Sequence, residues 1–320
     1  IYVRGLPTYD NANPLILVDG IVRPSFNQID PNEIQSINVL KDASATAVFG
    51  VKGANGVIIV TTRRGVSGKP QVSFSASYAI TEPTRIPNPL GSYQTATLYN
   101  VSKYAGGENN TYNALDLIKY RTGSSPYLYP DTHWVDEIMK DYSSMNQYNI
   151  NVSGGNALVK YFISGGYLGQ DGFYKHDPYT NYTRYNFRSN FDFDITKRFK
   201  LGINLGNRIE KRQYPGAARW SSWDIYRGSF STGGRSSTVY KPDGTLSSPV
   251  GAAAYNLLGV IGQRGVYKET KSVVETAINL KYDLDFITKG LAIRGQIAYD
   301  NTGTNGESWE KNYEGYNYRV

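Results

Sequence analysis

Hydrophobic and polar residues alternate over most of the chain after about residue 70. The clearest stretch begins at Arg184, where one face carries Tyr185, Phe187, Ser189, Phe191, Phe193 and Ile195, and the other carries Arg184, Asn186, Arg188, Asn190, Asp192 and Asp194. The same period recurs over 199–208, 274–286 and 291–300, and more weakly over 71–80, 146–154 and 157–168. Sustained alternation of this kind predicts half-buried β-strands. We therefore predict seven strands.

The connections between these strands alternate between short and long. Short turns fall at 154–156, 196–198 and 288–290. Long segments fall at about 81–143, 169–181 and 212–270, and a last one follows at 301–320. A soluble β-sandwich also has alternating strands, but this order of loop lengths is typical of outer-membrane barrels. Several strands also exceed the roughly 9–11 residues that cross a bilayer obliquely. The pattern favours a membrane all-β fold.

Seven strands do not close a barrel of this kind. A strand edge exposed to lipid would leave its backbone groups unpaired in hydrocarbon, which is not viable. The chain also opens on Ile1-Tyr2-Val3, a strand-like segment without a start methionine. We expect it to be part of something larger.

The residues before 70 have a different organisation. Leu15–Val18 is a continuous apolar run that ends at Asp19-Gly20, as a buried strand does when it enters a turn. Asp30 is then placed to cap a helix, with Pro31 at its first position and Glu33 placed to close a capping box. This part reads as a small α+β module.

The module continues through a second strand, a helical turn and a third strand. Ser36–Leu40 returns to strand, and residues 42–49 form a small helical turn with Gly50 as its C-terminal glycine. Asn55-Gly56 is a tight-turn dipeptide, and Val57–Thr62 is a β-branched strand. Such a module is too short to hold a complete core of its own.

Composition narrows the class of protein. There is no cysteine, which excludes disulfides and thiolate metal sites. No stretch reaches the roughly 20 apolar residues of a membrane-spanning helix, so a membrane location requires a barrel. The net charge of +7 is spread along the chain, whereas nucleic-acid binding needs a concentrated basic stripe. Tyrosine, with 28 residues, suits both membrane interfaces and wet binding surfaces.

The segment from Asp30 to Thr62, DPNEIQSINVLKDASATAVFGVKGANGVIIVTT, closely resembles the plug-domain signature of TonB-dependent transporters of the SusC/RagA family. Residues 13–20 resemble the preceding part of the same plug, and Ile1–Gly5 is similar to its IRIRG strand. Val39–Ala45 is the part that points to this family in particular. The strands after residue 70 resemble the family only in their general pattern, because strands of this kind carry little family-specific sequence.

This resemblance implies a fold and a function. The fold is part of a large antiparallel transmembrane β-barrel of about 22 strands with a small α+β plug domain in its lumen. Residues 1–69 are then the C-terminal part of the plug, and 70–320 are the first seven barrel strands with their extracellular loops. The protein would be an outer-membrane importer of oligosaccharides or oligopeptides, not an enzyme, and would need no cofactor.

The resemblance also implies partners. The TonB–ExbB–ExbD complex would energise transport, and a SusD-like surface lipoprotein would act as a lid over the extracellular loops. Outer-membrane lipid would surround the barrel, and an assembly of two transporters with two lids fits the family. Two alternatives stay open from the residues alone. One is a passive porin or surface glycan-binding barrel without energy coupling, and the other is a secreted β-rich carbohydrate enzyme.

Candidate functional residues fall into two groups. The plug signature, with a structural or gating role, comprises Asp19, Gly20, Lys41, Asp42, Gly50, Gly53, Asn55 and Gly56. Candidate substrate contacts are the loop aromatics Trp134, Trp220, Trp223 and Tyr226, together with Thr8, Tyr9 and Asn11 by analogy with the family. Aromatic faces can stack on sugar rings or peptide side chains, but these residues could equally pack the loops.

Other chemistry finds little support. The glycines from Gly50 to Gly56 have the wrong spacing and context for a phosphate cradle. The two histidines, His133 and His176, lie in predicted loops, and no metal site is expected. Asp192 and Asp194 project the same way and could mimic a glycosidase pair, but carboxylates facing a wet lumen are far commoner.

Overall fold

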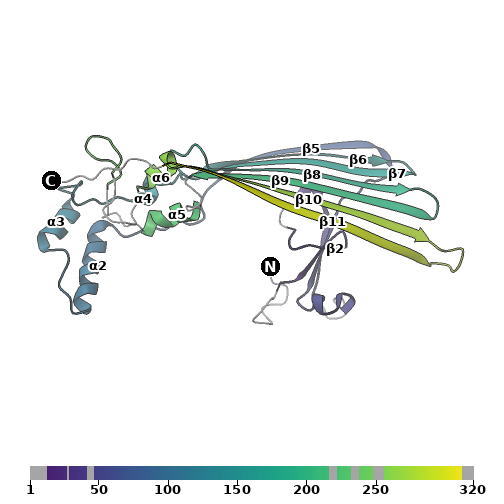
Figure 1. The fold of residues 1–320 in the computed structure, drawn as a ribbon, viewed down its shortest axis with the longest axis horizontal. Coiled ribbons are helices and arrows are strands. Elements are labelled where there is room, and N and C mark those ends of the chain that lie inside the picture. The colour runs from purple at the N-terminus through teal and green to yellow at the C-terminus, as the bar shows by residue number, and fades with distance from the viewer. Residues whose placement is uncertain are drawn as a thin grey trace.

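The computed structural model describes residues 13–26, 29–41, 47–215, 222–231, 238–247 and 256–311. The largest part of the structure is one antiparallel sheet, here called the large sheet, in which each strand pairs with its neighbours in the chain (Figure 1). Its seven strands are β5 (Gly68–Thr81), β6 (Ser143–Gly155), β7 (Val159–Asp171), β8 (Asn181–Asp194), β9 (Phe199–Pro215), β10 (Gly265–Asp283) and β11 (Ala292–Glu310). The seven predicted strands are confirmed.

Strand register places the alternating residues on two distinct faces of the large sheet. Arg188 lies opposite Gly206, which lies opposite Glu275, so these three positions share one face, here called the inner face. The outer face carries the apolar and aromatic positions. Tyr148, Tyr167 and Tyr185 lie side by side across β6, β7 and β8, with ring centroids 5.9 and 5.4 Å apart. Such cross-strand aromatic contacts stabilise the pairing.

The order of shorter and longer connections is as predicted, but the last short one spans 284–291 where a turn at 288–290 was predicted, because β10 ends at Asp283. Residues 156–158, 195–198 and 284–291 make the short ones, and 82–142, 172–180 and 216–264 make the long ones. The expectation of a loop over 301–320 is corrected in its first half, because β11 runs to Glu310. Residues 301–310 lack hydrophobic alternation, but β10 extends back to Gly265 and supplies a pairing partner for each of them. Backbone pairing here forms without a sequence signal.

The N-terminal residues form a second sheet, here called the small sheet, with strand order β2-β1-β4-β3. Its strands are β1 (Leu15–Val18), β2 (Ile21–Val22), β3 (Ile34–Leu40) and β4 (Val57–Thr62), with 3-10 helices η1 (Pro31–Glu33) and η2 (Ala47–Gly53). Asp19 and Gly20 both have positive φ, 50° and 85°, which is the geometry of a tight turn between paired strands. A few apolar side chains hold this sheet together: Val18, Ile29, Ile58 and Val60.

The predicted helical turn over 42–49 is only partly visible, because residues 42–46 lie outside the described part of the chain. The helix that follows is a 3-10 helix, η2, which runs on to Gly53. Gly50 has a non-helical backbone, with φ of 57° and ψ of −148°, and separates two helical turns within η2. A glycine permits this positive φ at no steric cost, so Gly50 ends the first turn as predicted, and a second turn follows it.

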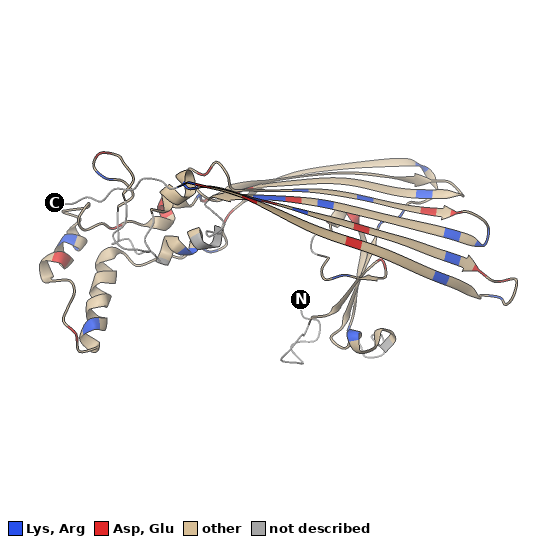
Figure 2. Cartoon of the chain, in the orientation of Figure 1, with Lys and Arg blue, Asp and Glu red and all other residues tan. Residues whose placement is uncertain are grey.

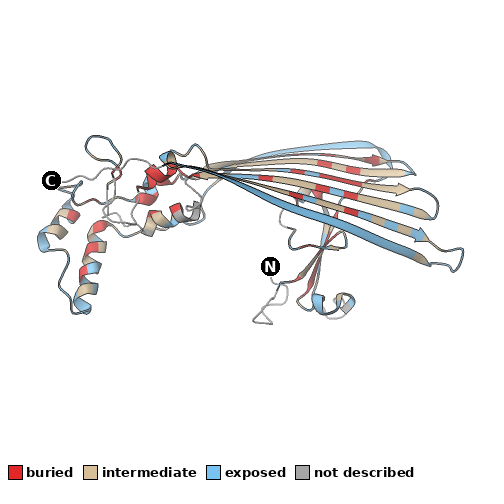
Figure 3. Ribbon diagram, viewed as in Figure 1, coloured by how far each residue is buried: buried red, intermediate tan, exposed pale blue. Residues whose placement is uncertain are grey.

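The long connections carry helices that gather beyond the strand ends (Figure 1). These are α2 (Ser92–Ala105), α3 (Ala114–Thr122), α4 (Trp134–Ile138), α5 (Ser222–Ser231) and α6 (Leu257–Gln263). Eleven buried residues from α4, α5, α6 and neighbouring segments form one apolar core, here called the loop cluster: Trp134, Val135, Ile138, Met139, Tyr174, Ile225, Val239, Leu257, Leu258, Val260 and Ile261. Figure 3 shows buried positions both here and on the middle of the strands.

Within the described residues, no helix is both long enough and apolar enough to cross a membrane.

Candidate functional site at the seam between the two sheets

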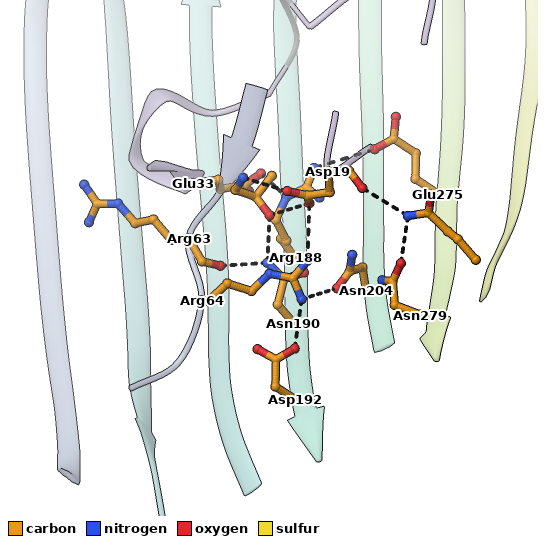
Figure 4. A network of polar contacts seen from close by, with 12 residues as sticks. Asp19, Glu33, Arg63, Arg64, Arg188, Asn190, Asp192, Asn204, Glu275 and Asn279 are labelled. Atoms are coloured by element: carbon orange, nitrogen blue, oxygen red, sulfur yellow. Dashed lines mark hydrogen bonds and ion pairs between the residues drawn. The ribbon is translucent and has the colours of Figure 1, made fainter. Parts of the chain in front are cut away.

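The small sheet lies against the inner face of the large sheet, and the contact between them is polar (Figures 1 and 4). Buried inner-face residues include Asn149, Asn151, Ser164, Asn186, Arg188, Asn190 and Asn204. Asparagine, serine and arginine side chains are normally solvated, and burying them is unfavourable unless they find partners. The small sheet supplies many of those partners. We call this contact the seam.

Glu33 and Arg188 form the most deeply buried ion pair of the seam. Arg188 Nε donates a hydrogen bond to Glu33 Oε2 at 2.8 Å, and the two residues are only 6% and 2% exposed. Burial raises the pKa of the Glu33 carboxyl, while the Arg188 guanidinium opposes the rise. The position of Glu33 follows from η1, whose N-cap Asp30 accepts a hydrogen bond from the backbone N–H of Asn32.

The capping box predicted from Asp30 and Glu33 is therefore only half formed. Asp30 caps as expected, but the Glu33 carboxylate reaches across to β8. Its other oxygen, Oε1, is buried and has no hydrogen bond partner within the described residues. A charged partner outcompetes a single backbone N–H, because charge-assisted hydrogen bonds are roughly twice as strong as neutral ones.

The ion pair extends into a chain of charges across β8, β10 and β11. Arg188 Nη2 lies 3.6 Å from Glu275 Oε2 on β10. Glu275 also pairs with Arg23 of the small sheet's chain segment, and Arg23 lies 3.1 Å from Asp300 on β11. Each cation thus bridges carboxylates from different elements. Separating the two sheets would expose or unpair all of these groups together.

A second group of contacts lies lower on β8 and β9 and involves the end of β4. Arg64 Nη1 lies 3.2 Å from Asp192 and donates a hydrogen bond to Asn204 Oδ1 at 2.8 Å. The Asn190 amide donates to Thr62 Oγ1 at 3.0 Å and to the carbonyl oxygen of Arg63 at 2.7 Å. These contacts hold the segment that leads from β4 into β5 against the inner face.

Gly65 belongs to the same connecting segment and is required by its close approach to the wall. A Cβ at this position would lie 2.2 Å from the backbone nitrogen of Tyr161 on β7. Backbone atoms cannot move aside as a flexible side chain can, so only glycine fits. The sequence showed this glycine, but nothing in its spacing indicated what it would touch.

The signature residue Asp19, in the turn between β1 and β2, forms hydrogen bonds to β4 of the small sheet and to β11 of the large sheet. Its carboxylate accepts hydrogen bonds from the Thr62 backbone N–H at 2.9 Å and from Thr62 Oγ1 at 2.6 Å. Its carbonyl oxygen accepts one from Gln296 Nε2 of β11 at 3.0 Å. Gly20 lies next to the same glutamine. Asp19 and Gly20 therefore lie at the seam.

The other signature residues lie away from these contacts. Gly50 and Gly53 belong to η2, and Gly56 has φ of 95° in the turn before β4. Asn55 precedes that turn, and Lys41 is exposed at the end of β3. Asp42 lies outside the described residues. These positions shape the small sheet itself.

The structure separates the candidate substrate contacts. Thr8, Tyr9, Asn11 and Trp220 lie outside the described residues, and only the backbone of Trp223, in α5, is described. Trp134 is 1% exposed in the loop cluster, so its burial supports the alternative that this ring packs the loops. Tyr226 is half-buried, packs against the loop cluster and also lines a cavity. These residues are not brought together into one site.

The acidic pair considered as a catalytic dyad is occupied by cations. Asp192 lies beside Arg64, and Asp194 lies 3.1 Å from both Lys160 and Lys200. Figure 2 shows acidic and basic residues along the same strands. No group of three or more potential metal ligands occurs within the described residues. The acids thus act in ion pairs of the inner face.

Sequence reasoning placed Arg188 on the polar face but missed its partners. The pairing of Arg188 with Glu33 gave no local signal, because a contact between residues 155 positions apart is not written in the sequence around either of them. One usable signal was present. Charged residues at alternate positions of a long strand need a polar environment, and the small module was the nearest source of one.

Comparisons with known proteins give the two sheets a context. The family model for the TonB-dependent receptor plug domain matches residues 1–57. TonB-dependent receptor P3 of Formosa agariphila is 39% identical over 202 residues, which cover 63% of this chain and 18% of that protein. SusC of Bacteroides thetaiotaomicron is 29% identical over 224 residues, covering 64% of this chain and 20% of SusC.

Solved structures extend the likeness to nearly the whole chain. A structure of the RagAB peptide importer in its closed-closed state superposes on 93% of this chain with a TM-score of 0.68 and 25% identity, covering 35% of that chain. An open-open state of the same importer gives a TM-score of 0.68 with 24% identity. At this identity the likeness shows a shared fold only. The chain spans about a fifth of the length of the curated relatives it matches.

Proposed function

Because this chain is the plug domain and following strands of a TonB-dependent receptor of the SusC/RagA type, we propose that it forms the gate and part of the wall of an energy-coupled importer. The small sheet is the plug, and the large sheet is a section of an outer-membrane β-barrel. The protein is a transporter and not an enzyme. The strands β5 and β11 at the two edges pair with further strands that complete the barrel, since open edges are not viable in lipid.

The observation that carries this proposal is the chemistry of the seam. A gate must stay closed at rest and must separate from the wall under load. Ion pairs and hydrogen bonds such as Glu33–Arg188 and Asn190–Thr62 hold the plug in register. When the sheets part, water can solvate each of these groups, so the separated state is not heavily penalised. An apolar seam would instead expose hydrocarbon surface on opening.

The cargo and partners follow the same proposal. The importer takes up oligosaccharides or oligopeptides, pulled open by the TonB–ExbB–ExbD complex and covered by a SusD-like lid lipoprotein. The solved neighbour is a peptide importer with a second component, as its designation RagAB indicates. The helices of the loop cluster lie at the end of the strands where such a lid would sit. Two transporters with two lids form the full assembly.

Tethering the plug to the wall tests the gating role. The chain has no cysteine, so the pair Thr62→Cys and Asn190→Cys introduces a single linkable site across the seam. We expect oxidation of the double variant in the full-length protein to abolish uptake by cells, and a reductant to restore it. Each single variant serves as the control, and its uptake should be the same under oxidising and reducing conditions.

Energy coupling is tested separately by collapsing the proton gradient. The proposal expects uptake of labelled oligosaccharide or oligopeptide to stop. The alternative of a passive porin or surface glycan-binding barrel expects uptake to continue. Uptake that persists in cells without a proton gradient would contradict the importer proposal.

A further inference from the structure

Charge is nearly absent from the outer face of the large sheet. Strand register assigns each paired residue of the described strands to one of the two faces, and among these the charged outer-face residues are Asp171, Lys211, Lys268 and Glu307. All of them lie at the loop end, which is the end of the strands nearest the loop cluster. A face without charge over the rest of its length is suited to lipid.

Aromatic residues mark both ends of this uncharged band. At the loop end they are Tyr148, Tyr167 and Tyr185. At the other end Phe199 and Tyr282 lie side by side, with ring centroids 6.3 Å apart. Phe199 and Ile209, which is opposite Tyr185, are ten positions apart on β9. This is roughly 33 Å along the strand, or about 25 Å of height for a tilt of about 40°, which matches the apolar band of an outer-membrane barrel.

Lys211 and Lys268 lie directly beyond this band. Lys211 is the next residue after Ile209 on the same face of β9. It lies opposite Thr270 of β10, and Lys268 lies opposite Gln213, so the two lysines are diagonal neighbours on adjacent strands. Such residues are roughly 7–8 Å apart. Both lysines are exposed, and neither forms an ion pair within the described residues.

Neutral hydrogen-bonding residues share the face with the two lysines. Lys211 lies between Thr183 of β8 and Thr270 of β10, and Asn305 of β11 lies opposite Thr270. Hydroxyl and amide groups can both donate and accept hydrogen bonds. We call Lys211, Lys268, Thr183, Thr270 and Asn305 the lysine patch. Because β9 and β10 each have a neighbour on both sides, the strands around the two lysines are all present.

Two carboxylates border the lysine patch without neutralising it. Glu307 lies opposite Lys268 on β11, but no ion pair joins the two within the described part of the chain. Asp171 is on β7, two strands away from Lys211, and its carboxylate accepts a hydrogen bond from the Ser144 hydroxyl. The patch therefore presents two neighbouring ammonium groups next to an apolar surface.

We propose that the lysine patch binds the phosphorylated headgroup of a glycolipid in the outer leaflet of the membrane. This goes beyond import and rests on the proposed orientation, in which the long connections lie outside the cell. The two ammonium groups can contact one phosphate from two sides, because ionised partners make the strongest hydrogen bonds. The threonine hydroxyls and the Asn305 amide can exchange hydrogen bonds with the hydroxyls of the sugar that carries the phosphate.

Continuity between the patch and the apolar band favours a lipid over a soluble anion or a protein. Lys211 follows Ile209 on the same face, so a molecule held at the lysines also reaches Ile209 and Tyr185. An amphiphile fits both parts at once, with its phosphate at the lysines and its acyl chains along the band. A soluble anion would use only the first part, and a protein partner would have to displace lipid from the second.

Lipid binding to delipidated full-length transporter in detergent tests the proposal by native mass spectrometry. The probes are lipid A, the same lipid A with its phosphate removed, and phosphatidylglycerol. We expect phosphorylated lipid A to bind most tightly. Lys211→Gln and Lys268→Gln should each weaken it about fivefold, and the double variant about 25-fold, as expected for single charges at an anionic membrane surface. Lys211→Arg keeps the charge and should bind within about twofold of the parent.

A lysine on the other face of the same strand provides the matched control. Lys271 lies between Thr270 and Ser272 on β10, at the same height as the patch, but it faces inward. Lys271→Gln makes the same change in net charge and should leave lipid binding unchanged. Glu307→Gln removes the bordering negative charge and should strengthen binding.

Three results would overturn the proposal. One is unchanged binding of phosphorylated lipid A to the double variant, and another is an equal loss of binding in Lys271→Gln. The third is equal affinity for lipid A without phosphate or for phosphatidylglycerol, because the patch would then not recognise a phosphorylated glycolipid. None of these results depends on transport. Uptake that survives loss of the proton gradient would refute the importer and leave the measured lipid affinities standing.

Discussion

The seam and the loop cluster are both buried, but the seam consists of polar and charged side chains and the loop cluster of apolar ones. The seam is held by ion pairs and hydrogen bonds, with Glu33, Arg188 and Asn190 at its centre. The loop cluster is held by aliphatic and aromatic side chains around Trp134 and Ile261. In the loop cluster, burial removes apolar surface from water, a gain that is lost in full if the helices separate. In the seam, the same groups can be satisfied by protein or by water.

This difference indicates which contact is permanent and which is reversible. Several buried polar atoms of the seam have no partner within the described residues, among them Glu33 Oε1, Asn151 Oδ1 and Asn204 Nδ2. A contact that leaves such atoms unpaired is not optimised for strength, since each one is costly to desolvate. The loop cluster has the character of a folding core, whereas the seam has the character of an interface that opens.

Removing the central cation should produce the largest effect and act only on the seam. Arg188→Ala leaves the Glu33 carboxylate buried without its partner, and we expect the plug to be held about 3–5 kcal/mol less tightly. The measurement is the urea concentration at which full-length protein in planar bilayers becomes conductive. Combining Arg188→Ala with Glu33→Gln should restore part of the loss, and strictly additive effects would show that the two residues do not act as a pair.

A cavity created in the loop cluster should cost a similar free energy, but it should affect the loop cluster and leave the seam unchanged. Trp134→Ala removes a ring that is 1% exposed, at an expected cost of about 3–5 kcal/mol. Limited proteolysis within the 216–264 connection should become faster, while the conductive urea concentration stays at its parent value. Trp134→Phe, which keeps an aromatic ring, is the control. A shift in plug release with Trp134→Ala would show that the two regions are coupled.

Removing one neutral hydrogen-bonding group should have a smaller effect at the seam. Asn190→Ala leaves Thr62 Oγ1 and the Arg63 carbonyl without their donor, with an expected loss of about 1–3 kcal/mol. The same conductance assay applies. Asn301→Ala, at an exposed position of β11 whose neighbour across the sheet is Val274, is the matched control and should leave plug release unchanged.

The smallest effect concerns pH and a single group. The pKa of Glu33 is raised in the docked plug by burial, so the docked state holds its proton more strongly than the released state does. Its contribution to docking is complete below the ordinary carboxyl pKa of about 4.5 and is lost as pH rises through the raised value. Arg188, Asp30 and Glu275 face the group and are present in both arms of the test.

The measurement is the difference in plug release between the parent and Glu33→Gln across this pH range. We expect the parent to lose docking stability relative to the variant as pH increases from about 4.5. Parallel pH profiles for the two proteins would contradict the prediction. The comparison isolates one carboxyl, because the two proteins differ only at Glu33.

Much of the architecture was readable before the structure. Alternation predicted the seven strands and their two faces, because side chains on a strand point to opposite sides at every step. The plug strands Leu15–Val18 and Val57–Thr62 were readable from apolar runs between turn residues. The end of β11 was not, because residues 301–310 are paired through their backbone alone and carry no apolar pattern.

The residues of the seam were predictable from the sequence only in part. The sequence placed Arg188, Asn190 and Asp192 on one polar face, and the plug signature indicated a module to meet that face. It could not pair Arg188 with Glu33, which is 155 positions away, nor show that Gly65 lies on the backbone of β7. It also could not distinguish Trp134 in the core from Tyr226 beside a cavity.

The physical reason is the range of the information. Strand period, turn residues and the absence of cysteine are local properties, fixed by side-chain chemistry at each position. Which inner-face charge meets which plug residue depends on how the two sheets lie against each other, since a hydrogen bond forms only within about 3 Å. The sequence by itself determined the wall and its two faces. The tertiary structure alone decided where the gate is fastened.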